Sequence, residues 1–388
     1  MDQCATDRGI RRDESLVGPG TNQIISGVGA DYFSLSLAKS PPMLSAYRLK
    51  LFLTLLPVAL TMSVHAQQMG TVSNPYVLNP SATTVVWGYY WSEAKPVLHV
   101  QSGDYVRVRT VLTSNPERLE AAGVAPADVE QELRDVQAVK DRGPGGHVLT
   151  GPIYVDGADS GDVLEVRFDS INLAIPYGYN AIGQAGFLSD EIFSRKMRIV
   201  PLDKSTMLGH FSDGIDIPLH PFFGSVGVAP PAAAGRWNSA PPWIHGGNLD
   251  NKELVAGTTL YLPVFVKGAL LEIGDGHAAQ GNGEVDITAI ETSLITKLHL
   301  VVHKGKSIHW PWAESPTHII TMGDDRDLNA ATHIAVREMI HWLMAEKGMS
   351  QEDAYMLCSV AADVDITELV DGNVGVHVML PKSVFVKK

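Results

Sequence analysis

Polar and apolar residues alternate along much of this chain, a pattern that is typical of strands with one buried face. Residues 104–112 show it most clearly, because Tyr105, Arg107 and Arg109 fall on one face and the residues between them on the other. Similar strand-like runs occupy residues 83–90, 97–103, 153–158, 162–173, 197–202, 211–219, 294–305 and 375–386. Many strands at short spacing predict a β-rich fold.

Helical spacing interrupts the strand pattern in two regions. Residues 116–140 carry apolar residues at helical intervals, but Gly123 and Pro126 divide them, so we expect two short helices. Residues 329–347 and 351–361 predict two more helices, and Ser350 with Asp353 resembles a capping box at the start of the second. Residues 175–200 have no clear period and are interpreted as an excursion packing near the functional site. Single helices among many strands predict an α+β, β-rich fold.

The first 66 residues are predicted to be separate from this fold. Residues 1–42 match no targeting pattern and are interpreted as an unassigned extension, which a start codon placed too early would explain. Residues 43–66 have the form of a signal peptide, because Arg48 and Lys50 precede an apolar, mostly uncharged run and cleavage is expected after Ala66. The apolar run is shorter than the ~20 residues that span a bilayer, so export is favoured over a membrane anchor. The mature protein, residues 67–388, would form one domain and be periplasmic or secreted.

Composition excludes several classes of function. The chain has 30 basic and 43 acidic residues, a net charge of −13, and a surface of this sign repels the phosphates of nucleic acids. No membrane partner is expected after signal cleavage. Cys358 is the one cysteine of the mature sequence, and its apolar helical surroundings favour a buried structural thiol over a nucleophile. The sequence has no nucleophile elbow, phosphate loop or dinucleotide fingerprint.

Candidate chemistry is concentrated between residues 243 and 293. Two glycine-rich segments, HGGNLD at 245–250 and GDGHAAQGNGE at 274–284, are predicted to be loops. An apolar, β-branched run at 258–271 separates them, and a strand-like run follows at 285–290. Asp, Asn and Gly are common in ordinary turns, but the concentration of metal-binding and proton-transferring groups here favours one site where the two loops meet.

The residue types in these loops suit a metal-assisted hydrolase. Catalytic zinc takes about three His, Asp or Glu ligands and leaves one position for water. Asp275 and His277 would supply two ligands from one tight turn, and His245 or Asp250 would supply the third. Water bound to such a metal becomes a nucleophile near neutral pH.

Other polar residues of the region would complete the reaction. Glu284 would relay a proton, because an amide needs its leaving nitrogen protonated. Asn248 and Gln280, with backbone N–H groups, would hold the carboxamide or its oxyanion. His147, on the comparable segment GGHVLTGP, is either a further catalytic residue or a histidine that caps a turn. Six further histidines lack metal-ligand spacing and are interpreted as structural or solvated: His299, His303, His309, His318, His333 and His341.

Several segments together resemble the acetamidase/formamidase family. In chain order they are GPIYVDGADSGDVLEV, GSVGVAP, HGGNLDNKEL, GDGHAAQGNGEV with TAIET, EKGMSQEDAYMLCSVAADV and LVDGNVGVHVMLPKSVF. The resemblance runs from about residue 86 to residue 385. It implies a sandwich-like β core, an oligomeric assembly, and hydrolysis of short aliphatic amides to carboxylic acid and ammonia. It also implies that some members contain metal and that some open lactams.

We therefore expect an exported amidohydrolase that acts on C–N bonds other than peptide bonds, in amides such as formamide and acetamide. Its cofactor would be a divalent metal, zinc, and its assembly a homo-oligomer. One alternative is a lactamase that opens cyclic amides at the same site. Another is a non-catalytic binding protein of the periplasm. A third, metal-free catalysis through Cys358, predicts inactivation by thiol alkylation.

Overall fold

The computed structural model describes residues 69–386. The predicted extension at 1–42 and the predicted signal peptide at 43–66 lie outside these residues. None of the helices in the described part has both the length and the apolar character needed to cross a membrane.

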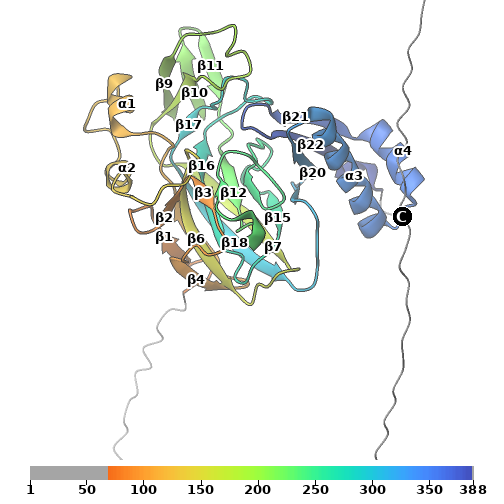
Figure 1. The fold of residues 1–388 in the computed structure, drawn as a ribbon. Coiled ribbons are helices and arrows are strands. Elements are labelled where there is room, and N and C mark those ends of the chain that lie inside the picture. Colours follow the sequence, from red (N-terminus) through yellow and green to blue (C-terminus); the bar gives the residue numbers. More distant parts are fainter. Residues whose placement is uncertain (1–68, 387–388) are drawn as a thin grey trace, which may run out of the picture. The chain divides into compact units, whose positions relative to one another are not determined.

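A nine-stranded sheet forms one layer of the β core (Figure 1). Its strands lie in the order β1 (Tyr76–Leu78), β5 (Tyr105–Arg109), β18 (Leu294–His303), β7 (Val163–Leu173), β15 (Thr259–Pro263), β19 (Trp312–Glu314), β20 (His318–Asp325), β22 (Val374–Pro381) and β21 (Asp363–Glu368). The alternation predicted for β5 is confirmed, because Val106 and Val108 are fully buried while Tyr105, Arg107 and Arg109 are partly exposed.

An eleven-stranded sheet forms the other layer and carries the candidate site. Its main path is β11 (Ile215–Pro218), β10 (Leu208–Ser212), β9 (Lys196–Asp203), β8 (Tyr177–Ile182), β17 (Glu291–Thr292), β16 (Leu271–His277), β12 (Phe222–Gly227) and β14 (Gly246–Asn248). The strand β6 (Val148–Asp156) joins this path at β16 and pairs with β2 (Val85–Trp87) and β4 (Leu98–Gln101). A separate pair is formed by β3 (Tyr89–Tyr90) and β13 (Trp237–Asn238).

One hydrophobic core joins the two sheets. Phe168 and Leu298 of the nine-stranded sheet belong to the same buried cluster as Ile153, Phe223 and Leu271 of the eleven-stranded sheet. Burying a side chain of this size stabilises the fold by about 1.5–3 kcal/mol. The β-rich, sandwich-like architecture expected from the sequence is thus confirmed.

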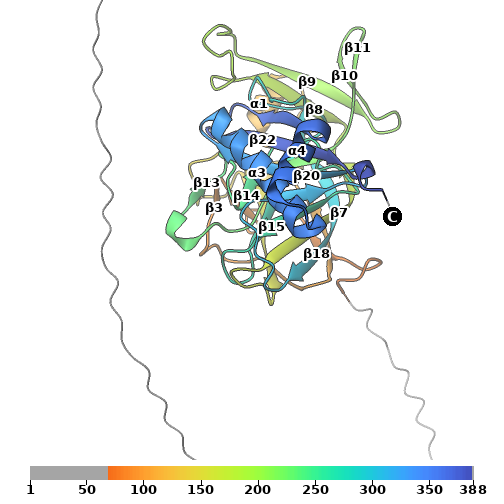
Figure 2. The ribbon, with the colours of Figure 1, turned by 90° about the vertical axis from the view of Figure 1, so that its right-hand side faces the viewer.

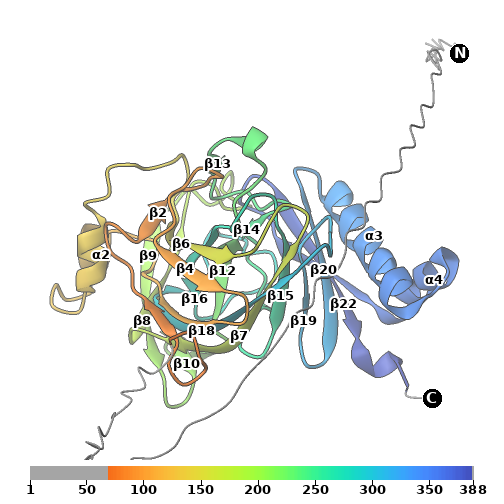
Figure 3. The same ribbon diagram turned by 90° about the horizontal axis from the view of Figure 1, so that it is seen from below.

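Helices lie at opposite ends of the β core (Figures 1 and 3). At one end are α1 (Pro116–Ala121) and α2 (Gln131–Val136), the two short helices predicted for residues 116–140. At the other end, α3 (Leu328–Lys347) and α4 (Gln351–Ala361) pack with β20 and β22 (Figure 2). The predicted cap is confirmed, because the backbone N–H of Asp353 donates to Ser350 Oγ at 3.1 Å. Two short 3₁₀ helices, η1 (Ala232–Ala234) and η2 (Lys382–Val384), complete the fold.

Several expectations about loops and strands were wrong. The glycines at 246–247 and 274–276 lie in β14 and β16, whereas residues 285–290 contain no strand. The cause is close packing: a Cβ on Gly274 would lie 2.5 Å from the carbonyl oxygen of Val148, so glycine here serves a tight strand contact instead of a turn. The aperiodic region 175–200 contains β8 and the start of β9, both paired in the sheet.

Candidate active site

The candidate site is built on β16, whose seven residues are all buried. Side chains two positions apart on a strand point to the same face, so Asp275 and His277 lie together. The neighbouring strand β17 places Glu291 directly opposite His277. As a result, His277 Nε2 is 3.2 Å from Asp275 Oδ2 and 3.2 Å from Glu291 Oε1.

Two further carboxylates approach His277 from adjacent segments. Asp250 follows β14, and its Oδ1 lies 3.8 Å from His277 Nδ1. Glu284 lies in the turn before β17, with its Oε1 3.9 Å from His277 Nε2. Asp250, Asp275 and Glu284 have φ angles of 44°, 53° and 41°, a left-handed conformation that is uncommon for residues with a side chain. Such strain is concentrated at functional sites, where surrounding contacts maintain it.

Gly224 of β12 allows these groups to converge. A Cβ at this position would lie 2.4 Å from Asp250 Oδ1, 2.6 Å from Asp275 Oδ2 and 2.8 Å from His277 Cε1. The space that a methyl group would fill is therefore shared by three of the candidate side chains. Glycine is required here for close approach and not for a special backbone angle.

Two amide side chains hold the cluster in place. His277 Nδ1 lies 2.9 Å from Gln280 Oε1, and Gln280 Nε2 donates to the carbonyl oxygen of Asp250 at 2.7 Å. This second bond orients the Gln280 oxygen toward Nδ1, so Nδ1 carries a proton and Nε2 is the ring nitrogen that faces the carboxylates. Asn248 Nδ2 donates to Asp250 Oδ2 at 2.5 Å and to Asp371 Oδ2 at 3.1 Å.

These hydrogen bonds affect the substrate-binding roles that were predicted for Gln280 and Asn248. Both polar atoms of Gln280 are engaged with protein groups, which gives Gln280 a part in orienting His277. Asn248 also lines the cavity described next, so its contact with a substrate stays a prediction.

A small cavity of about 70 Å³ lies against the cluster. It is lined by Thr113, His147, Tyr179, Asn248, Asp250, Asp275, Glu284, Ile287, Thr288, Glu291 and Asp371. His147 Nδ1 lies 3.0 Å from Ser239 Oγ, which fixes the ring, and its Nε2 is 3.9 Å from Asp275 Oδ2. Thr113 Oγ1 donates to Asp275 Oδ1 at 3.1 Å. His147 thus joins the site, although the sequence left its role open.

Burial and mutual repulsion perturb the acids of this cavity. Burial, strengthened by neighbouring carboxylates, raises the pKa of Asp250 and of Glu284 well above the usual value. Burial also raises the pKa of Glu291 and of Asp371. Asp275 differs, because burial would raise its pKa but the adjacent imidazoles of His147 and His277 outweigh burial and lower it.

The same balance acts on His277. Burial disfavours a charged imidazole, but the carboxylates of Glu291 and Asp275 outweigh burial and raise the pKa of His277 well above its usual value. Five buried carboxyl groups facing two imidazoles form a strongly cation-attracting site.

The residues present fit a divalent cation. Two overlapping groups of candidate ligands share His277: Asp275, His277 and Glu291, and Asp250, His277 and Glu284. Ligand atoms around tetrahedral zinc lie about 3.3 Å apart, given bonds of roughly 2.0–2.1 Å. In the first group the two separations from His277 Nε2 are 3.2 Å each, which matches this spacing. His277 Nε2, Asp250 Oδ1 and Glu291 Oε2 are buried without a hydrogen-bond partner among the described residues. A cation would satisfy these atoms.

His245, predicted as a possible metal ligand, does not join the cluster. Its buried ring packs against Tyr90, Trp237 and Trp243, and neither ring nitrogen has a hydrogen-bond partner among residues 69–386. Burial lowers the pKa of His245 to about 3. The reason for its position is local: His245 lies in the turn between Trp243 and Gly246, where the Gly246 N–H donates to the carbonyl oxygen of Trp243 at 2.9 Å, and β14 begins only after it.

Sequence reasoning missed Glu291 and Asp371. Glu291 lies beyond the segment predicted as strand, and only the pairing of β17 with β16 brings it to His277. Asp371 lies in the turn between β21 and β22, in a DGN sequence typical of turns, and its approach to Asn248 is a long-range contact. Cys358 is buried in α4, where burial raises the pKa of its thiol, so it does not offer a reactive thiolate.

A family comparison accounts for this arrangement. The family model described as Acetamidase/Formamidase family matches residues 85–239 and 231–387, which together include every residue of the cavity. The chain belongs to the acetamidase/formamidase family. The family predicted from the sequence motifs is therefore confirmed.

Acetamidase/formamidase relatives of known structure share the fold. The acetamidase of Bacillus halodurans is 30% identical, with a TM-score of 0.68, over 80% of this chain and 98% of that chain. The acetamidase of Yersinia enterocolitica is 31% identical, with a TM-score of 0.69, over 80% of this chain and 93% of that chain. A curated relative, the acetamidase of Mycolicibacterium smegmatis, is 28% identical over 240 residues, 46% of this chain. The match spans only 57% of that relative's length.

Proposed function

We propose that the protein hydrolyses short linear amides such as formamide and acetamide to carboxylic acid and ammonia. The observation that carries this proposal is the small cavity of about 70 Å³ lined by the His147 imidazole and five carboxyl groups. Pockets for drug-sized ligands measure roughly 300–1,000 Å³, and one water occupies about 30 Å³ of liquid. The cavity therefore suits a molecule of a few heavy atoms and excludes a peptide. Membership of the acetamidase/formamidase family supports the same substrate class.

Asp275, His277 and Glu291 are proposed to hold a divalent metal ion, zinc. When bound, such an ion would polarise a carbonyl oxygen and lower the pKa of a water molecule. Gln280 keeps His277 Nδ1 hydrogen-bonded, so that Nε2 faces the ion. Asp250 and Glu284 would stay beside the ion without being essential ligands.

Glu284 is proposed to relay the proton from water to the leaving nitrogen. Its carboxyl lines the cavity. The backbone around it is held in place, because the Glu284 N–H donates to the carbonyl oxygen of Gly281 and the Gly283 N–H donates to that of Thr367 in β21. His147 lines the same cavity, and its Nε2 would hydrogen-bond the carboxamide. Asn248 is the remaining candidate for orienting the substrate.

A larger depression of about 780 Å³ borders the cavity and shares Glu284 and Thr288 with it. It is the proposed route for substrate entry and product release. Export to the periplasm or beyond, based on the signal-like residues 43–66, and assembly as a homo-oligomer remain part of the proposal.

The test combines metal analysis with an activity assay on untagged residues 67–388. Bound metals are quantified, and ammonia release from formamide, acetamide and larger amides is measured before and after chelation. Stoichiometric zinc with chelator-sensitive ammonia release is the expected result. Turnover without bound metal would support the amidase activity and refute the role proposed for the metal. Metal without turnover on linear amides would favour a lactamase, which opens a simple lactam without releasing ammonia. Ligand binding without turnover of linear amides or lactams would favour a non-catalytic binding protein.

A further inference from the structure

A second group of metal-binding side chains lies outside the cavity, at the opposite end of the β core from α1 and α2. Glu338 and His341 are three residues apart on α3, so they project from the same helix face. His309 comes from the segment that joins β18 to β19. One potential ligand atom from each of the three residues lies within 4.8 Å of the other two.

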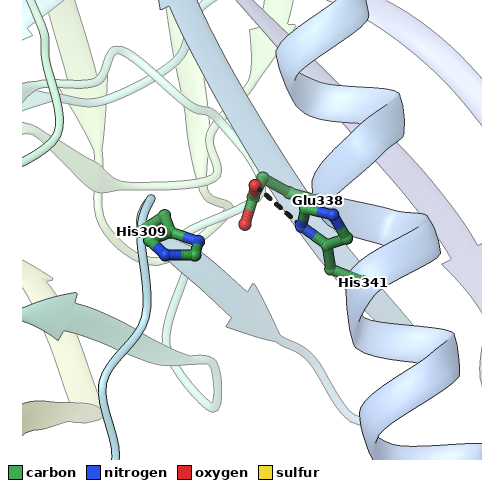
Figure 4. A group of neighbouring side chains, drawn as sticks. All are labelled: His309, Glu338 and His341. Atoms are coloured by element: carbon green, nitrogen blue, oxygen red, sulfur yellow. Dashed lines mark hydrogen bonds and ion pairs between the residues drawn. The ribbon is translucent and has the colours of Figure 1, made fainter. Parts of the chain in front are cut away.

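The three side chains face one another (Figure 4). His341 Nδ1 lies 3.2 Å from Glu338 Oε1, and the imidazole rings of His309 and His341 are 6.5 Å apart at 66°. In the view of Figure 4 the Glu338 carboxylate lies between the two rings. The Glu338 side chain is 16% exposed and that of His341 48%, so the group opens to solvent.

Aromatic packing fixes the position of the segment that carries His309. Trp312, three residues after His309, packs against Trp342, the residue after His341, with ring centroids 6.2 Å apart. Trp342 in turn packs against Phe385 at 6.3 Å. The approach of His309 to the helix therefore follows from these partly buried aromatic contacts beside the group.

We propose that His309, Glu338 and His341 form a surface site for a divalent transition-metal ion, with zinc as the best match. Two imidazoles and one carboxylate are a donor set that zinc, copper and nickel accept readily, and water can complete the coordination sphere from the open side. Ligand atoms around zinc lie about 3.3 Å apart, and the three atoms lie within 4.8 Å of one another, so the widest separation must close by at most about 1.5 Å. Rotation of the exposed imidazole rings supplies this movement.

The expected consequence is structural. The ion would tie α3 to the segment before β19 and so stabilise the packing of α3 on the nine-stranded sheet. This site shares no residue with the cavity cluster, and its loss should leave amide hydrolysis unchanged. His309 and His341 lack metal-ligand spacing in the sequence and were interpreted as structural or solvated, because only the fold brings them together.

The experiment measures zinc binding to untagged, metal-stripped residues 67–388 by equilibrium dialysis, with thermal unfolding in parallel. His309→Ala and His341→Asn should each lose one bound equivalent, or weaken it at least about 10-fold. Zinc should raise the Tm of the wild-type protein by a few degrees, and this shift should shrink in both variants. His333→Ala is the matched control, since His333 is exposed on the same helix but lies outside the group.

Each outcome decides the proposal. Unchanged stoichiometry and affinity in His309→Ala, matching the His333→Ala control, would overturn it. Should one variant fail to fold, Glu338→Gln gives an independent measure, because it keeps the shape but removes the carboxylate ligand. Failure of the proposed active-site metal would show differently: His277→Asn would then lose no zinc, whereas His309→Ala would still lose its equivalent.

Discussion

Gly224 is the position at which one added methyl group tests the candidate site most directly. In Gly224→Ala the new Cβ would lie 2.4, 2.6 and 2.8 Å from atoms of Asp250, Asp275 and His277, whereas ordinary contact begins at 3.4 Å. These three groups must therefore retreat by about 0.6–1.0 Å. They are buried and held by Asn248 and Thr113, so they cannot move independently.

A displacement of about 1 Å in reacting groups can lower activity about 100-fold. We expect kcat/KM for ammonia release from acetamide to fall at least that far in Gly224→Ala, together with loss of bound metal. The free energy of unfolding should fall by about 1–3 kcal/mol for the overpacking, partly offset by about 0.5–1 kcal/mol because alanine restricts the unfolded chain. The protein should therefore still fold, as circular dichroism and thermal unfolding would show.

The control is Gly281→Ala in the neighbouring turn. No described atom lies within 4 Å of a Cβ there, and the backbone is not left-handed, so activity should stay within about 3-fold of wild type. The reasoning is refuted if Gly224→Ala keeps wild-type activity, or if Gly281→Ala loses as much activity as Gly224→Ala.

Three further changes test separate parts of the reasoning. Glu284→Gln keeps the shape but cannot carry the proton, so kcat should fall by about 10²–10⁴ with metal content unchanged; full turnover would remove the relay role. Gln280→Leu should weaken zinc about 10–100-fold in a titration, since His277 Nδ1 loses its partner; unchanged affinity would contradict that role. Burial raises the pKa of Asp324 to about 8, so native Asp324 holds its proton between about pH 4 and pH 8 while the unfolded chain releases it. Wild-type stability should therefore fall as pH rises through this range, by up to about 6 kcal/mol at 1.36 kcal/mol per pKa unit. Asp324→Asn cannot ionise, so in urea unfolding its gain over wild type should be larger at pH 8 than at pH 5, and an equal difference at both would refute the assignment.

The pattern of the chain predicted the features that depend on near neighbours. Alternation identified β5 and its buried valines, and helical spacing with the Ser350 cap identified α3 and α4. The two-residue spacing of Asp275 and His277 predicted that both act at one site, although in a tight turn and not in β16, where the structure places them. These features are set within a few residues, by side-chain periodicity and local hydrogen bonds.

Only the tertiary structure decided which of the polar groups meet. Glycine permits both turns and close strand contacts, so the sequence could not show that Gly274 and Gly276 lie inside β16. Glu291 reaches His277 through pairing of separate strands, and His309 reaches α3 through packing of Trp312 on Trp342. His245 was excluded because it lies in the turn before β14, where its ring packs among Tyr90, Trp237 and Trp243. Such contacts join residues distant in sequence and follow from burial of the whole chain, which no local pattern encodes.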